Sequence, residues 1–224
     1  MSRLSLWHNS IRKGTRVIRL YDYWRSSSAY RVRIGLNLLG LAYERVEVDL
    51  LAGDQTGTAN LARNPQGVVP TLEIDGLCLT QSLAILEYLN DTRAAGWLPP
   101  DAAGRARVRA LAMAIAMEIQ PVCNLRVAKT VVAASGGTMT LEDWMRQHIA
   151  PGLEAVEAML GHAATGRFCH GDSVTLADVC LVPQLYNAKR WGVAYDHLTR
   201  LSTVEPAMLA LPAVQAAHPD RARP

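Results

Sequence analysis

The sequence has few of the features that mark several functional classes. Its four cysteines are scattered and none belongs to a CxxC pair, which argues against a zinc knuckle or a dithiol redox site (Cys78, Cys123, Cys169 and Cys180). No apolar run reaches the roughly 18 residues of a membrane span. The formal net charge is only +3, without a long basic run, so we expect neither a nucleic-acid nor a membrane partner. We interpret the cysteines as free thiols, which persist in a reducing compartment, and therefore expect a cytoplasmic protein. We expect no metal site.

What the sequence does contain is enough apolar material for one or two globular cores, because half of its 224 residues are hydrophobic. The first sixteen residues are different, being basic and without an acidic group. Their apolar residues are too dispersed for a signal peptide. We expect residues 1–16 to be a disordered extension.

Residues 17–100 predict an α/β domain. Val17 to Tyr23 is typical of a strand, Ser28 to Leu39 of a helix that Gly40 ends, and Val46 to Leu50 of a second strand. Strand, helix and strand in this order imply a parallel pair with a right-handed crossover. The polar stretch 52–64 gives no clear prediction. Two further strands, 71–74 and 77–80, flank the hairpin dipeptide Asp75-Gly76, and a helix begins at Ser82, so the order is βαβ followed by ββα.

Residues 101–224 predict an all-helical domain after the linker Gly96 to Pro100. Apolar residues from Val108 to Ile119 recur at three and four positions, as in a long amphipathic helix, and Pro121 should kink or end it. Gly136-Gly137 marks a break. Two capping boxes, Thr140 to Asp143 and Thr175 to Asp178, should each open a further helix.

A first candidate site is the segment Trp24 to Arg33, where the first strand meets the first helix. Backbone amides at a helix start carry partial positive charge and lower the pKa of a thiolate placed there. The hydroxyl of Ser26 or Ser27 could donate a hydrogen bond to the same sulfur. A plain serine N-cap explains the pattern equally well.

Two more candidate sites follow. In Asn64 to Thr71, Pro70 precedes a strand, and a cis bond would let Val69 offer its amide and carbonyl to an extended peptide. Without other evidence trans is the default for such a bond. Gln81-Ser82 opens a helix and suits an anion such as an α-carboxylate, although plain capping is the more common role.

Together these three segments resemble the glutathione transferases, and within them the zeta group. That group's motif SSCS, followed by a basic, an apolar and a basic residue, corresponds here to Ser26-Ser-Ser-Ala29 and Arg31-Val-Arg33. The segments NPxxxVP, QS and the second capping box also match. The resemblance implies a thioredoxin-like glutathione-binding domain at 17–100, a helical substrate domain at 101–224 and a homodimer. It implies reduced glutathione as cofactor, held by six residues: Ser26, Gln66, Val69, Pro70, Gln81 and Ser82.

The resemblance also implies an activity, the glutathione-dependent cis–trans isomerisation of a maleyl keto acid such as maleylacetoacetate, in aromatic amino-acid or aromatic-compound catabolism. Ser26, Ser27 and Arg25 are the implied catalytic residues. Arg25, Arg126 and Arg190 match arginines that contact the small anionic substrate, although a single arginine is more often a solvated surface charge. Ser28 stands where the group has a cysteine. Activity remains compatible with this change because the working sulfur belongs to glutathione, whereas a disulfide exchanger would need a protein thiol.

Three alternatives remain open. One is a maleylpyruvate isomerase, which would use the same residues. Another is a general transferase that conjugates glutathione to electrophiles and needs a more apolar second site. The third is a non-catalytic interaction module, which would not need the full set of glutathione-binding residues.

Overall fold

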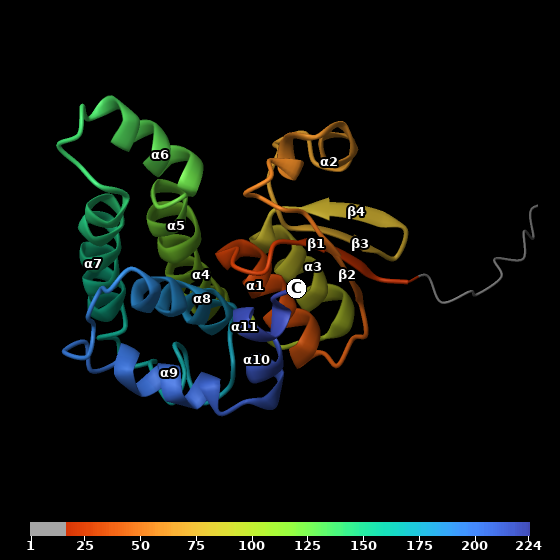
Figure 1. Cartoon of the computed structure of the whole chain (residues 1–224). Helices are drawn as coiled ribbons and strands as arrows, with labels where there is room; N and C mark the ends of the chain where they lie inside the picture. The colour runs from red at the N-terminus through yellow and green to blue at the C-terminus, as the bar shows by residue number, and fades with distance from the viewer. Residues whose placement is uncertain (1–16) are drawn as a thin grey trace, which may run out of the picture.

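A four-stranded mixed sheet organises the first part of the chain (Figure 1). The structure is a computed structural model that describes residues 17–224, so the predicted extension 1–16 lies outside the described residues. The strand order is β2-β1-β3-β4, in which β1 pairs in parallel with β2 and antiparallel with β3. The strands are β1 Arg19–Asp22, β2 Glu44–Glu47, β3 Thr71–Ile74 and β4 Leu77–Thr80.

The predicted βαβ–ββα order is confirmed. Helix α1 (Ser27–Leu38) makes the crossover between β1 and β2, and α3 (Ser82–Arg93) follows the hairpin. The hairpin turn falls on Asp75 and Gly76, whose φ angles of 55° and 85° are the left-handed values that the dipeptide favours.

The second strand lies earlier than its alternating residues predict. Residues Glu44–Glu47 pair with β1, whereas Val48 and Leu50 follow the strand and pack in a small apolar cluster with Tyr21 and Tyr23. The alternation of apolar and polar residues indicates which side chains are buried. In this segment the buried side chains continue past the last residue whose backbone pairs with β1. The stretch 52–64 forms a 3₁₀ turn η1 (Asp54–Thr56) and helix α2 (Thr58–Arg63).

The second part of the chain is helical throughout (Figure 1). The long helix predicted around Val108 is present and ends one residue after Pro121, and a π turn precedes that proline. Helix α6 ends before Gly136-Gly137, as predicted. The elements in order are α4 Ala102–Met113, η2 Ala114–Ile119, α5 Gln120–Val122, α6 Leu125–Ala134, α7 Leu141–Met159, α8 Leu176–Arg190, α9 Leu201–Leu209, α10 Pro212–Ala216 and α11 Pro219–Ala222.

Both predicted capping boxes are present and open α7 and α8. Asp178 in the second box is fully buried, and its carboxylate accepts hydrogen bonds from the Thr175 N–H (2.8 Å), the Thr175 hydroxyl (2.6 Å) and the Cys169 N–H (2.8 Å). These bonds fix the start of α8, the most deeply buried helix of the second part, on which Arg190 is the last residue.

One apolar core joins the two parts. Helix α1 packs against α8 and α3, and Gly35 of α1 lies so close to Leu86 and Trp97 that an added Cβ would stand 2.5 Å from a Leu86 methyl carbon. The chain then returns to α1, because α10 packs on it and Arg33 Nε donates to the Ala217 carbonyl (3.0 Å). Of the helices in residues 17–224, none alone has the length and hydropathy of a membrane span, and one bent pair, Ala102–Val122 with Leu125–Ala134, passes on length and composition.

Candidate active site

The turn between β1 and α1 presents three serine hydroxyls. Ser26 is the N-cap of α1, with its Oγ accepting from the Ala29 N–H at 3.2 Å. Accepting this bond leaves the Ser26 hydroxyl hydrogen available for a ligand, so capping and ligand binding are compatible. Ser27 is the first residue of the helix, and the Ser28 hydroxyl donates to Gln120 Oε1 at 3.3 Å.

The segment before β3 differs from the default expectation, because the Val69–Pro70 bond is cis. An X–Pro bond has only a small intrinsic preference for trans, so the surrounding fold decides the isomer. Val69 itself is buried. The β1–β3 ladder ends at Thr71, so the peptide groups of Val69 lie beyond the last strand pair.

Two predicted binding residues from separate segments meet at the start of α3. The Gln81 side-chain amide donates to Gln66 Oε1 at 2.7 Å, and Gln81 has a left-handed φ of 66°. Ser82, the first residue of α3, is buried and its Oγ accepts from Arg31 Nη1 at 3.3 Å. The first-turn amides of this twelve-residue helix suit a carboxylate.

Arg190, the last residue of α8, lies within electrostatic range of Arg25. Desolvation by the surrounding protein, and then the positive charge of Arg25, lower the pKa of the Arg190 guanidinium. Arg25 lies over the Trp24 ring at 4.6 Å and donates to the Tyr23 hydroxyl at 3.3 Å, and its buried Nε has no partner. Within residues 17–224 neither Arg25 nor Arg190 takes part in an ion pair. Two guanidinium groups that influence each other's charge and lack an ion-pair partner suit an anion with carboxylate ends.

Among residues 17–224, Arg126 forms no hydrogen bond or ion pair with Arg25 or Arg190. It lies on α6, its side chain is exposed, and its N–H donates to Oδ1 of the helix cap Asn124 at 2.9 Å.

The four thiols are poorly suited to act as nucleophiles. Burial raises the pKa of Cys123 and of Cys180 to about 11 and that of Cys169 well above its usual value. Cys78 is exposed, and its pKa is also raised, mainly by partial burial. A thiolate at this site has to come from a ligand.

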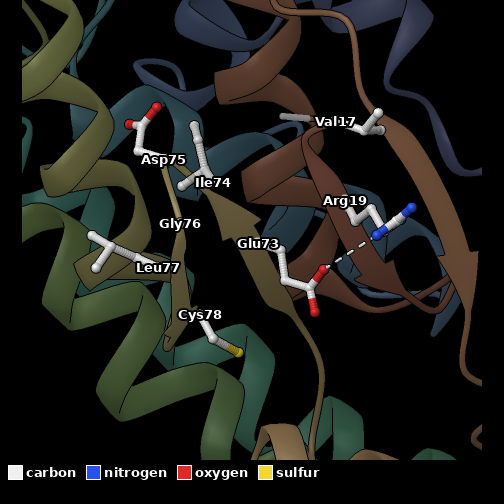
Figure 2. Close-up of a pocket in the computed structure, with 8 residues that line it drawn as sticks. All are labelled: Val17, Arg19, Glu73, Ile74, Asp75, Gly76, Leu77 and Cys78. Atoms are coloured by element: carbon white, nitrogen blue, oxygen red, sulfur yellow. Dashed lines mark ion pairs between the residues drawn. The ribbon is translucent and has the colours of Figure 1, made fainter. Parts of the chain in front are cut away.

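A separate hollow of about 400 Å³ lies at the β3–β4 hairpin, lined by residues that include Val17, Glu73 and Cys78 (Figure 2). Its charged groups are already paired, Arg19 with Glu44 (2.9 Å) and with Glu73 (3.8 Å), and Asp75 with Arg93. None of the predicted site residues lines it.

Three residues near the candidate site were missed by sequence reasoning. Gln120, in the second part of the chain, accepts from the Ser28 hydroxyl, Arg31 donates to Ser82 Oγ, and Arg223 lies over the Trp24 ring at 5.4 Å. Gln120 stands just before Pro121, the break that the sequence did predict. The first-helix motif includes Arg31 but does not indicate its contact with Ser82, and no sequence signal distinguishes Arg223 from other arginines.

Comparison with known proteins defines the class. The N-terminal domain model of glutathione S-transferase matches residues 16–91, and the C-terminal domain model matches residues 102–216. The chain therefore belongs to the glutathione S-transferase family, in its zeta-class isomerase group.

Several similar proteins are named as isomerases. The chain is 56% identical to the maleylacetoacetate isomerase of Rhizobium meliloti (strain 1021), over 92% of this chain and 97% of that protein. The crystal structure of maleylacetoacetate isomerase from Anaeromyxobacter dehalogenans 2CP-1, with bound GSH in the active site, has a TM-score of 0.81 and 50% identity, with coverage of 92% and 96%. A maleyl pyruvate isomerase, described as a bacterial glutathione S-transferase in zeta class, has a TM-score of 0.86 and 36% identity, with coverage of 91% and 97%.

Proposed function

We propose that this protein is a glutathione-dependent enzyme that isomerises maleylacetoacetate to fumarylacetoacetate. The observation that carries the proposal is that Arg25, next to Ser26, and Arg190 lie within electrostatic range of each other and have no ion-pair partner among residues 17–224. The substrate is a diketo acid with carboxylate groups, which such a pair can hold. The name of the relative that is 56% identical agrees with this activity.

Glutathione fits the residues present. Six residues would hold it: Ser26, Gln66, Val69, Pro70, Gln81 and Ser82. The supporting observations are the Gln66–Gln81 hydrogen bond, the buried Ser82 at the start of α3 and the peptide groups of Val69 beyond the ladder. When bound, glutathione supplies the thiolate that adds reversibly to the cis double bond and so allows rotation about it.

The chain's own residues would prepare and hold the reactants. The Ser26 hydroxyl, or Ser27 in its place, donates a hydrogen bond to the sulfur and favours its charged form. Arg25 and Arg190 orient the carboxylates, and Arg126 on α6 is proposed as a third contact. Positive groups near the reacting carbons also stabilise negative charge that develops on the keto oxygen.

An absorbance assay with maleylacetoacetate and maleylpyruvate, each with and without glutathione, tests the proposal. Conversion of maleylacetoacetate that requires glutathione supports it. Faster turnover of maleylpyruvate would favour the second candidate, which the structural likeness to a maleyl pyruvate isomerase supports. Conjugation of simple electrophiles without isomerisation would favour the general transferase, and glutathione binding with no reaction would favour a non-catalytic module.

We also propose the organisation of the whole protein. Residues 17–100 would form the thioredoxin-like glutathione-binding domain and 101–224 the substrate domain, a division supported by the bounds of the two family matches. Exposed apolar residues such as Met113 and Met117 support a two-fold homodimer. The four free cysteines support a cytoplasmic location.

A further inference from the structure

Helix α1 carries two arginines that are equally buried and differently compensated. Arg33 is 1% exposed, and its guanidinium is fully paired. Its Nη1 donates to both carboxylate oxygens of Asp22 at 2.7 and 2.8 Å, while Nε and Nη2 donate to the carbonyls of Ala217 and Trp24 at 3.0 and 2.9 Å. The charge of Arg33 is therefore balanced within the protein.

Arg31 has no such balance. It is also 1% exposed, yet within residues 17–224 its hydrogen bonding is limited to the bond from Nη1 to Ser82 Oγ, and Nε and Nη2 have no partner. No described carboxylate pairs with it. Cys180 on α8 lies within electrostatic range of Arg31, and it is a neutral thiol because burial raises its pKa to about 11. Burial accordingly lowers the pKa of the Arg31 guanidinium.

An unpaired buried charge is costly, and an anion placed close to it removes much of that cost. The position next to Arg31 is the N-terminus of α3, whose first-turn amides also favour an anion. Ser82 Oγ accepts a hydrogen bond from the Arg31 cation, so the Ser82 hydroxyl hydrogen can be donated to a bound anion. The hydrogen bond from Arg31 polarises the hydroxyl and strengthens the bond that it donates. Two independent features therefore meet at Ser82.

We propose that Arg31 is a positioning residue that supplies, through Ser82, the counter-charge for the α-carboxylate of the γ-glutamyl unit of glutathione. The inference rests on the proposed function, because it assumes that glutathione is the ligand. Arg31 does not touch the ligand itself. It makes one end of the site positive and orients the Ser82 hydroxyl.

The test is calorimetric binding of two ligands to the full chain. One ligand is glutathione, and the other is γ-aminobutyryl-cysteinylglycine, which lacks only that α-carboxylate. Arg31→Met should weaken glutathione binding by roughly tenfold or more while changing binding of the analogue little. The Tm of the ligand-free variant should stay unchanged or rise, because an unpaired buried charge has been removed.

Two further variants sharpen the test. Arg31→Lys keeps the charge and should retain part of the preference for glutathione over the analogue. Ser82→Ala keeps the positive charge of Arg31 but removes its hydrogen-bond acceptor, so it should lose much of that preference. Arg31→Met should then cost less in the Ser82→Ala background than it does in the wild type. An equal loss for both ligands, full additivity with Ser82→Ala, or failure of Arg31→Met to fold would overturn the inference. If the wild type bound no glutathione, the proposed function would fail instead.

Discussion

At the scale of the residue, Ser26 combines two tasks in one hydroxyl group. Its oxygen accepts the Ala29 N–H that starts α1, and its hydrogen remains for a ligand. The group is held in place by the helix that it caps, so its direction is fixed before a ligand arrives.

Ser26→Ala should raise the pKa of the glutathione thiol in the complex and slow isomerisation. The donated hydrogen bond favours the thiolate, and a bond to a charged group contributes about 1.5–3 kcal/mol, or about one to two pKa units. Ultraviolet titration of bound thiolate and steady-state kinetics measure the two effects. Ser27→Ala is the parallel variant and Ser28→Cys the control expected to be tolerated. If neither alanine variant changed either quantity, the sulfur site would lie elsewhere.

Arg190→Ala should act on substrate rather than on sulfur. Loss of a carboxylate contact should lower kcat/KM by roughly tenfold to a hundredfold, mainly through KM, with the bound-thiol pKa unchanged. Lys189→Ala is the matched control, because the neighbouring Lys189 pairs with Glu205 at 2.9 Å at the protein surface. Equal effects of the two variants on KM would remove Arg190 from the substrate site.

The sequence predicts the residues of the candidate site whose chemistry is local. The serines, Val69-Pro70 and Gln81-Ser82 stand out because turn and cap residues act on their own backbone neighbours. The role of Arg31 could not be predicted, because it depends on Ser82, 51 residues away, and on the lack of a paired carboxylate among the described residues. The bond between Ser28 and Gln120 spans 92 residues and is equally invisible in a linear pattern.

At the scale of the element, features that neighbouring residues determine were predicted, and features that depend on residues distant in sequence were not. The Asp75-Gly76 hairpin and both capping boxes were predicted because four adjacent residues determine each of them. The bounds of β2 were wrong because strand pairing with β1 decides them. The short helix α2 was missed because six residues carry too little periodicity.

The two capping boxes have the same hydrogen-bond arrangement, but only the second is buried. They therefore allow a prediction of how burial changes the stability that a capping box contributes. Asp178→Asn should destabilise the protein by about 2–4 kcal/mol, because the amide cannot accept all three hydrogen bonds at a fully buried position. Asp143→Asn, in the exposed box that opens α7, should cost much less. Urea unfolding of both variants measures the difference. Similar midpoints would show that burial does not matter here.

At the scale of the whole molecule, the proposed dimer gives a simple measurement. The exposed methionines of the α4–η2 segment should be covered by a second copy of the chain. Light scattering at micromolar concentration should give about twice the 24.4 kDa of one chain. Met117→Lys should favour the monomer, because a charge would be buried at the contact. A mass near one chain for the wild type would exclude the homodimer at that concentration.

Residues 1–16 provide a second test at this scale. We expect their removal to leave activity and Tm almost unchanged, because the described residues already form one large core with a small second cluster. Thermal unfolding and the isomerase assay on the shortened chain check this. A marked fall in either would show that the segment packs on the rest of the protein.

The bond from Arg33 Nε to the Ala217 carbonyl has a consequence for synthesis on the ribosome. The donor and the acceptor are 184 residues apart, and Asn37 likewise donates to the Ala213 carbonyl, 176 residues away. A nascent chain holding the sheet and α1 therefore lacks two acceptors for side chains of its first helix until almost all of the protein has emerged. Contacts of such sequence separation form late. The first part of the chain reaches its final packing only after translation of α10. In a nascent chain on a ribosome that has stalled earlier, α1 should therefore be loosely packed and sensitive to protease.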